Sequence, residues 1–329
     1  MKTYFITGGC GFIGSNFIHY LIKNQLAGQI INLDKLTYAG NSDNLSRIED
    51  NGSYHFIKGD ISNQEVVRSI LEEYKPNVIV NFAAESHVDR SIDGPVEFIR
   101  TNVVGTLNLL LESHNWLKKM NSSTEESFKF IHISTDEVYG SLGKTGKFQE
   151  STPYDPSSPY SASKAGSDHI ARSWYRTYNF PVLITNCSNN YGPYQFPEKL
   201  IPLMIINALT GKELPVYGSG LNIRDWLYVD DHCKAIQKII EKGRPGETYN
   251  IGGDNEITNI QIVETICEIL DNKIPLDSGK LYKDRIVYVD DRPGHDFRYA
   301  IDATKIKREI GWEPKESFET GIQKTVLWY

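Results

Sequence analysis

Cysteine is scarce in this chain, and the few cysteines form no recognisable pattern. Four occur among 329 residues, and none has CxxC or CxxH spacing: Cys10, Cys187, Cys233 and Cys267. The spacing therefore indicates neither a disulfide framework nor a zinc site, and we expect buried, reduced thiols. The acidic pairs 230–231 and 290–291 lack further spaced ligands, so we predict no metal.

Long apolar runs and a basic excess are also missing. The longest apolar run, near residues 200–209, is interrupted by Pro202 and Asn207 and falls short of the ~20 apolar residues of a membrane span. Met1 leads within a few residues into a glycine-rich turn, not into a signal peptide. The formal net charge of -7 argues against a broad basic surface for nucleic acid. We expect a soluble, cytoplasmic protein that binds neither membranes nor nucleic acid.

Glycine is concentrated near the start of the chain. An apolar run at residues 4–7 leads into GGCGFIG at residues 8–14 and then into an amphipathic stretch. Strand, glycine turn and helix together place a pyrophosphate on a helix N-terminus. The next predicted strand, 29–33, ends in Asp34, whose carboxylate would accept hydrogen bonds from ribose hydroxyls and repel a 2'-phosphate. We predict NAD binding in preference to NADP; the alternative is a structural turn with an incidental aspartate.

The same alternation of strand and helix continues along the chain. We predict strands at 54–58, 78–82, 128–133 and 182–186, and helices at 64–74, 95–117 and 159–178. Repeated βα units imply a Rossmann-like, doubly wound parallel sheet. We predict an NAD-binding domain over 1–187, with a strand near 248–251 returning to it, and a smaller α/β lobe over 188–329. Residues 118–127 are expected to form an exposed loop.

Two short stretches carry residues suited to proton transfer. Thr135, Asp136 and Glu137 follow a predicted strand, at the sheet edge where parallel sheets bind ligands. Tyr160 and Lys164 are four residues apart and share a helix face. A nearby ammonium lowers the pKa of a phenol from about 10, which would make Tyr160 a proton acceptor. The alternative is an ordinary helix pair.

Other polar residues are open to two interpretations. Lys199, Arg224 and Arg292 are candidate anion ligands, because cationic side chains, and guanidinium forks above all, match phosphate oxygens. Each alone is better explained as a solvated surface charge, and only convergence of all three in one cleft would favour an anion site. His87 and Asp89 are either catalytic or structural loop residues.

Longer motifs spread over nearly the whole chain carry a family resemblance. With the glycine loop, Asp34 and the YxxxK pair, the chain resembles the extended short-chain dehydrogenase/reductases that act on nucleotide sugars, and among them the dTDP-glucose 4,6-dehydratases. The motifs are TDEVYG (135–140), AAESHVDR (83–90), NNYGPYQ (189–195), KLIP (199–202), RDWLYVDD (224–231) and DRPGHD (291–296). One departure is Cys10, where the family usually has alanine.

The resemblance implies a reaction and roles for five residues. It implies dehydration of dTDP-glucose to dTDP-4-keto-6-deoxyglucose in deoxysugar biosynthesis of the dTDP-rhamnose type. Tyr160, its pKa lowered by Lys164 and the nicotinamide charge, would take the 4-hydroxyl proton, and Thr135 would hydrogen-bond the 4-oxygen. Glu137 would remove the 5-proton and Asp136 would protonate the departing 6-hydroxyl. NAD, tightly bound, would be reduced at the 4-position step and would return its hydride to carbon 6.

The resemblance also implies the surroundings of both ligands. Around NAD it places Gly8, Gly11, Phe12, Ile13, Gly14, Asp34, Lys35, Leu36, Thr37, Asp60, Ile61, Phe82, Ala83, Ala84, Ser86, Thr101, Tyr160, Lys164 and Asn190. Around the nucleotide sugar it places Ser86, Thr135, Asn189, Lys199, Leu200, Pro215, Val216, Tyr217, Arg224, Asn259, Asp291, Arg292, Pro293, Gly294 and His295.

It further implies a homodimer through helices 95–117 and 159–178, paired as a four-helix bundle. The alternatives are a UDP-sugar 4,6-dehydratase or a 4-epimerase on the same scaffold, or a non-catalytic NAD-binding regulator.

Overall fold

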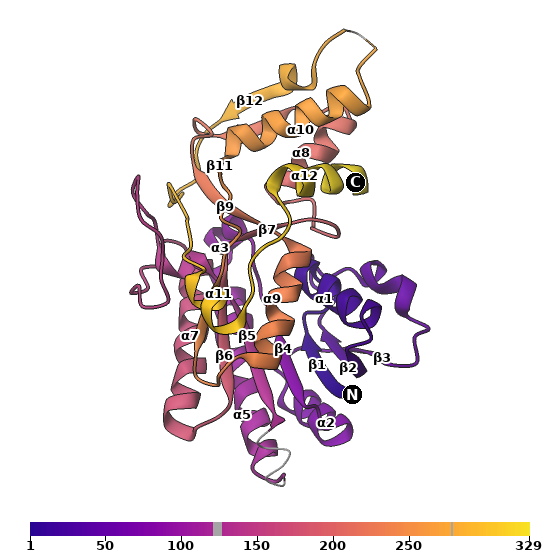
Figure 1. Ribbon diagram of the computed structural model, residues 1–329, viewed down its shortest axis with the longest axis vertical. Helices are drawn as coiled ribbons and strands as arrows, with labels where there is room; N and C mark the ends of the chain where they lie inside the picture. The colour runs from indigo at the N-terminus through magenta and orange to yellow at the C-terminus, as the bar shows by residue number, and fades with distance from the viewer. Residues whose placement is uncertain (121–126, 278) are drawn as a thin grey trace.

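A seven-stranded sheet forms the centre of the molecule (Figure 1). The computed structural model describes residues 1–120, 127–277 and 279–329, so most of the loop expected at 118–127 lies outside the described residues. All neighbouring strands are parallel. Their order is β10 (Thr248–Ile251), β6 (Val182–Cys187), β5 (Lys129–Thr135), β4 (Val78–Asn81), β1 (Lys2–Thr7), β2 (Ala27–Asp34) and β3 (Tyr54–Lys58). The predicted doubly wound parallel sheet is confirmed.

Helices cover both faces of this sheet. One face packs against α1 (Phe12–Lys23), α9 (Val229–Lys242) and α11 (Thr304–Ile310). The other packs against α2 (Gln64–Tyr74), α5 (Thr106–Leu117) and α7 (Pro159–Tyr178). Strands β4, β5, β6 and β10 are apolar-rich runs because both of their faces are buried, whereas the edge strand β3 is partly exposed. α9, β10 and α11 come from the second half of the chain, so the sheet layer draws on both halves of the sequence.

The turn between β1 and α1 is held by close backbone contacts at two glycines. Gly8 has φ +71°, and a Cβ there would lie 2.6 Å from the backbone nitrogen of Ala83. A Cβ on Gly14 would lie 2.4 Å from the carbonyl oxygen of Gly8. A larger residue at position 8 would push the turn away from the backbone that follows β4, and one at position 14 would push the helix away from the turn. The first turn of α1 therefore lies against the ends of β1 and β4.

Helix α7 begins and ends at strong local signals. Pro159 occupies its first turn, and Ser158 and Ser161 form a capping box. Asn179 ends the helix in the left-handed conformation, with φ 52°. The bounds agree with the predicted helix 159–178. The early start places Tyr160 and Lys164 in the first two turns, next to the end of β5.

The predicted helix 95–117 is not regular. It is divided into α4 (Pro95–Phe98), a π-helix η2 (Ile99–Gly105) and α5, and it is preceded by α3 (Val88–Asp93). Within η2, the buried Asn102 side chain bonds the backbone nitrogen and oxygen of Glu85 at 2.9 and 3.0 Å, and donates to Ser163 Oγ at 2.8 Å. Apolar periodicity does not distinguish a π-turn from an α-turn, so the sequence predicts only a continuous helix.

The remaining elements form a lobe beyond the carboxyl ends of the strands, at the top of Figure 1. Its helices are α8 (Leu200–Leu209), α10 (Asn259–Lys273) and α12 (Phe318–Trp328), which share one apolar core. Its sheets are β11 (Glu256–Thr258), β9 (Ile223–Tyr228) and β7 (Asn189–Tyr191), and β12 (Ile286–Val289) with β8 (Leu214–Tyr217). The lobe also contains the short 3-10 turn η4 (Tyr282–Arg285), whereas the 3-10 turns η1 (Ser42–Ile48) and η3 (Asp136–Tyr139) follow β2 and β5 outside the lobe.

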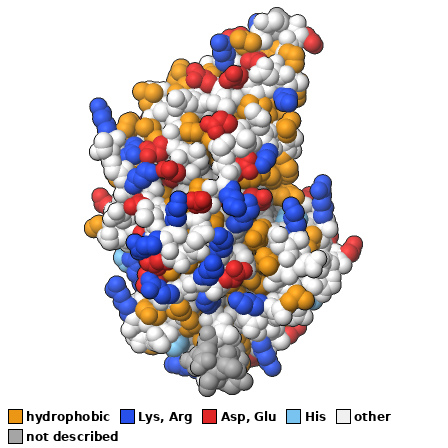
Figure 2. All heavy atoms as spheres, viewed as in Figure 1, with side chains coloured by type: hydrophobic (Ala, Val, Ile, Leu, Met, Phe, Trp, Pro, Cys, Tyr) orange, Lys and Arg blue, Asp and Glu red, His pale blue; other side chains and the backbone are white. Residues whose placement is uncertain are grey.

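Acidic and basic side chains are both present over the length of the face shown in Figure 2. Within the described residues, no helix has the length and apolarity needed to cross a bilayer.

Candidate active site

A cavity of about 300 Å³ lies at the carboxyl ends of the central strands. Every residue predicted to surround NAD lines it, except Leu36, whose backbone N–H instead donates to Asp34 Oδ1 at 2.8 Å. All five predicted catalytic residues also line it. Parallel βα units account for this, because the ends of several strands meet at one sheet edge.

One end of the cavity fits a dinucleotide. Gly11 caps α1 without a side-chain bond, and Phe12 to Gly14 line the cavity, so unpaired helix N–H groups are available for an anion. The buried Asp34 carboxylate accepts the N–H of Cys10 at 2.8 Å in addition to that of Leu36. Burial raises the pKa of Asp34, and these two bonds oppose that rise. Each carboxylate oxygen of Asp34 keeps a lone pair free, so the two oxygens can accept hydrogen bonds from the two hydroxyls of a ribose.

The catalytic turn, residues 135–137, follows the end of β5. Thr135 caps η3 by accepting the Glu137 N–H on Oγ1 at 3.2 Å. Asp136 is 1% exposed, and its Oδ2 has no hydrogen-bond partner among the described residues. Glu137 is half-buried and lines the same cavity. Two adjacent carboxyl groups therefore occupy environments of different polarity.

These environments separate the two pKa values. Burial, followed by the charge of Glu137, raises the pKa of Asp136 well above its ordinary range. Burial also raises the pKa of Glu137, but the positive charges of Lys199, Arg292 and Arg224 oppose it. Asp136 is therefore the group of the pair that keeps a proton to higher pH and has one to give, and Glu137 is the more readily ionised group that can accept one.

We expect Asp136→Asn to stabilise the NAD-free protein at about pH 7 relative to the wild type. The folded chain binds this proton more tightly than the unfolded chain, so wild-type stability is lost as the pH rises from about 4, the ordinary aspartate pKa, through the raised folded value. Asparagine carries no such penalty. Thermal melts of both proteins should diverge as the pH rises over that window, and parallel curves would contradict the prediction.

Tyr160 and Lys164 lie one turn apart on α7 and are both buried. Lys164 Nζ donates to the carbonyl of Ile133 at 2.7 Å. In the protein alone, burial and then the charge of Glu137 raise the pKa of Tyr160 well above 10, whereas the sequence predicted a lowered value. That prediction was wrong for the unliganded chain, because it counted the ammonium and left out burial and the neighbouring carboxylate.

The predicted substrate residues fall into two groups. Ser86, Thr135, Asn189 and Lys199 line the cavity, and Lys199 Nζ donates to the carbonyl of Ser86 at 2.9 Å. The others do not line it: Leu200, Pro215, Val216, Tyr217, Arg224, Asn259, Asp291, Arg292, Pro293, Gly294 and His295. Several of these contact one another in the lobe, among them Tyr217, Asp291 and His295.

Arg224 is not a solvated surface charge. It is 5% exposed, donates to the carbonyl of Asp296 at 2.9 Å and lies over the ring of Tyr299, 4.2 Å from its centroid. Its charge acts on both Asp136 and Glu137.

A second polar cluster joins the lobe to helix α3, which follows β4. Arg292 Nη1 lies 3.6 Å from Asp89 Oδ1, and the Tyr217 hydroxyl donates to Asp89 Oδ2 at 3.5 Å. His295 Nδ1 lies 2.6 Å from Asp291 Oδ1, with its ring edge-on to Tyr217. Asp89 therefore binds lobe residues.

His87 has a structural contact of its own: its Nδ1 accepts the Arg90 N–H at 3.4 Å and caps α3. This contact accords with the structural interpretation of His87.

Some cavity-lining residues were missed by sequence reasoning. They are Leu33, Ala39, Gly40, Gly59, Glu85, Ile133, Ser134, Cys187, Ser188, Gln195, Phe196 and Glu198. Glu85 belongs to the motif at 83–90 and Gln195 to the motif at 189–195, and Ser134 directly precedes the motif at 135–140. Glu198 Oε2 lies 3.4 Å from Arg90 Nε, a pairing for which the sequence carries no local signal.

Comparisons with known proteins agree over the full chain. The family model described as GDP-mannose 4,6 dehydratase matches residues 5–325. The dTDP-glucose 4,6-dehydratase of Xanthomonas campestris pv. campestris strain B100 is 56% identical over 100% of this chain and 93% of its own length. That of Neisseria meningitidis serogroup B strain MC58 is 54% identical over 100% of this chain and 93% of its length.

Solved structures with this fold include enzymes of two activities. The dTDP-glucose 4,6-dehydratase of Bacillus anthracis, in complex with NAD, has a TM-score of 0.89 at 51% identity, over 100% of this chain and 96% of its own. DesIV of Streptomyces venezuelae, a dTDP-glucose 4,6-dehydratase with NAD and TYD bound, has a TM-score of 0.90 at 45%, over 99% and 96%. The UDP-glucose 4-epimerase of Thermotoga maritima has a TM-score of 0.87 at 30%, over 99% and 98%.

Proposed function

This chain belongs to the family that the GDP-mannose 4,6 dehydratase model describes, among the dTDP-glucose 4,6-dehydratases, and from this premise we propose that it converts dTDP-glucose to dTDP-4-keto-6-deoxyglucose with NAD. The observation that carries the proposal is the pair Asp136 and Glu137, side by side at the end of β5 in the cavity that also holds Tyr160 and Lys164. Because an epimerase has the same scaffold, the fold alone does not indicate the reaction. The two adjacent carboxyl groups do indicate it, since dehydration needs an acid and a base side by side.

The glycine turn, the first turn of α1 and Asp34 hold the cofactor. The remaining predicted NAD-binding residues on the cavity wall enclose it. NAD bound there would supply the hydride acceptor for the 4-position of the sugar and the hydride donor for carbon 6, with a proton restored at the 5-position, and would be regenerated in each turnover. Its nicotinamide charge would oppose the effect of Glu137 on the pKa of Tyr160.

Five residues divide the proton transfers. Tyr160 accepts the 4-hydroxyl proton, and Lys164 supplies positive charge beside it. Thr135 donates a hydrogen bond to the 4-oxygen. The 4-ketone acidifies the 5-position, from which Glu137 removes a proton while Asp136 protonates the departing 6-hydroxyl. The separated pKa values of the two carboxyl groups suit these opposite roles.

We propose that the lobe, residues 188–329, holds the nucleotide diphosphate while residues 1–187 with β10 hold NAD. Lys199, Arg224 and Arg292 supply positive charge on the side of Glu137. The other predicted substrate residues in the lobe stay a prediction.

Exposed apolar side chains support the proposed homodimer. They lie on α3, α4, η2 and α5: Ile92, Val96, Ile99, Val104 and Leu107. Such a patch is typical of an interface, and packing against a second copy together with α7 would make a four-helix bundle. A cytoplasmic location stays a prediction.

We expect purified protein to remove one water from dTDP-glucose, and UDP-glucose to react far more slowly. Mass spectrometry of both nucleotide sugars after incubation measures this directly. An unchanged mass for dTDP-glucose would contradict the proposed function. Loss of water from UDP-glucose at an equal rate would favour a UDP-sugar 4,6-dehydratase, and a 4-epimer of unchanged mass would indicate an epimerase.

A further inference from the structure

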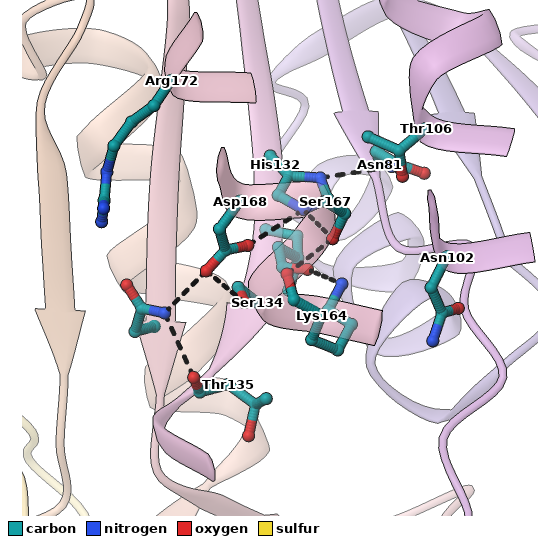
Figure 3. A network of polar contacts seen from close by, with 12 residues as sticks. Asn81, Asn102, Thr106, His132, Ser134, Thr135, Lys164, Ser167, Asp168 and Arg172 are labelled. Carbon is teal, nitrogen blue, oxygen red and sulfur yellow. Dashed lines mark hydrogen bonds and ion pairs between the residues drawn. The ribbon is translucent and has the colours of Figure 1, made fainter. Parts of the chain in front are cut away.

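Behind the cavity wall, a buried carboxylate joins strand β5 to helix α7 (Figure 3). Asp168 is fully buried, one turn after Lys164, and does not line the cavity. Its Oδ2 accepts hydrogen bonds from Ser134 Oγ at 2.8 Å, from the Tyr154 hydroxyl at 2.9 Å and from Asn186 Nδ2 at 3.2 Å. Neither the reaction steps above nor cofactor binding uses this carboxylate directly.

The contacts fix three successive residues at the end of β5, residues 133–135. The Ile133 carbonyl accepts a hydrogen bond from the Lys164 ammonium at 2.7 Å. The Ser134 hydroxyl donates to Asp168. The Thr135 carbonyl accepts from Asn186 Nδ2 at 3.1 Å, and the same amide donates to Asp168. The strand end that leads into the catalytic turn is thus bonded, residue by residue, to the helix that carries the Tyr160 and Lys164 side chains.

The network also assigns a charge to the carboxylate. Asn81 Nδ2 donates to His132 Nδ1 at 3.3 Å, so the His132 proton lies on Nε2, which is 3.1 Å from Ser167 Oγ and 3.2 Å from Asp168 Oδ1. Burial lowers the pKa of His132, and the ring is neutral at neutral pH. Burial alone would raise the pKa of Asp168, but its bonded partners and Lys164 lower it. The buried Asp168 carboxylate is therefore an anion, and the buried Lys164 ammonium is a cation whose charge acts on it.

We propose that Asp168 is a positioning residue that holds the catalytic turn against the catalytic face of α7, and that its negative charge balances the ammonium of Lys164. This inference rests on the proposed function, because the geometry that it protects is that of the dehydratase site. The charges of Asp168 and Lys164 act on each other, and a buried pair of opposite charges is weak evidence for added stability.

Several titratable groups face Asp168 and Lys164. They are His132 from β5, Tyr139 from η3, Tyr154 from the loop before α7, Arg172 from α7 and Cys187 from β6. Of these, Arg172 donates to the Tyr154 hydroxyl and not to the carboxylate. Asp168 is the carboxylate whose charge acts on Lys164, where it opposes the lowering of the lysine pKa by burial.

Asp168→Asn keeps the shape and removes the charge. We expect kcat to fall roughly ten- to hundredfold with KM for dTDP-glucose nearly unchanged, because misplaced reacting groups lower the rate without weakening binding. The high-pH limb of the kcat profile should move down by about one pH unit, since Lys164 loses its proton more easily without the anion. A crystal structure of the NAD-free variant should show the catalytic turn displaced from Tyr160.

Asp231→Asn is the matched control. Asp231 is also a buried carboxylate, and it accepts the backbone N–H groups of Lys315 and Glu316 in the lobe, away from the cavity. This variant should lose stability and keep the wild-type pH profile. A superimposable profile and unchanged kcat for Asp168→Asn would overturn the inference, whatever happens to its melting temperature.

If Asp168→Asn fails to fold, Ser134→Ala and Tyr154→Phe carry the test. Each removes one bond to the carboxylate and leaves its charge in place. We expect kcat to fall several-fold with an unmoved high-pH limb, and full kcat in both variants would overturn the positioning role. Failure of the proposed function is separate, since it would appear as absent dehydration in the wild type.

Discussion

Glu137→Gln is expected to lower the rate of water loss about a thousandfold, equivalent to about 4 kcal/mol, while oxidation of the sugar at the 4-position continues. Glutamine keeps the shape of the side chain and cannot take the 5-proton. Reduced nicotinamide should therefore accumulate on the variant when dTDP-glucose is added, visible by its absorbance, with no loss of mass from the sugar. Simultaneous loss of oxidation would contradict the assignment of Glu137 to elimination alone.

Solvent isotope exchange separates the two carboxyl groups. In D2O, Asp136→Asn should still exchange the 5-proton of the sugar for deuterium while losing water slowly, because the base is intact and the acid is missing. Glu137→Gln should show no exchange. Glu150→Gln is a suitable control, since Glu150 is also partly buried with a pKa raised by burial, yet it binds the Asn250 N–H outside the cavity. Exchange in both site variants, or in neither, would contradict the division of roles.

Local patterns were enough to predict the sheet and the helices that place the catalytic residues. Three short-range patterns each predicted the local structure that is observed. They are the glycine turn, the position of Asp34 at the end of a strand and the capped start of α7. Parallel topology then brings residues 100 positions apart to one sheet edge without any further sequence signal.

Long-range effects could not be read from the sequence. Burial of Arg224 depends on backbone carbonyls near residue 296 that lie more than 70 positions away. The raised pKa of Tyr160 depends on how deeply α7 packs and on the distance to Glu137, neither of which spacing reveals. The same holds for Asp168, since a buried aspartate and a solvated one look alike in a helix with many polar residues. Residues whose function depends on desolvation are thus the ones that sequence reasoning misjudges.

Tyr160→Phe is expected to slow the first step, oxidation at the 4-position, by about a thousandfold or more, since the phenol oxygen is the proton acceptor. Unlike Glu137→Gln, it should accumulate no reduced nicotinamide and show no exchange at the 5-position, because no ketone forms to acidify that proton. Tyr191→Phe, which alters a buried tyrosine of the lobe core, is the control and should oxidise substrate normally. Rapid formation of reduced nicotinamide by Tyr160→Phe would contradict the assignment.

The pH dependence of this step tests the electrostatics of Tyr160. Because burial and the charge of Glu137 both raise its pKa, the ionised phenol becomes more abundant, and oxidation faster, as the pH rises. Removing the Glu137 charge should lower the Tyr160 pKa, so the acid limb of the oxidation rate in Glu137→Gln should lie at lower pH than in the wild type. Single-turnover formation of reduced nicotinamide across pH measures both limbs. An acid limb that does not move would mean that the two groups titrate independently, and that bound NAD alone determines the protonation of Tyr160.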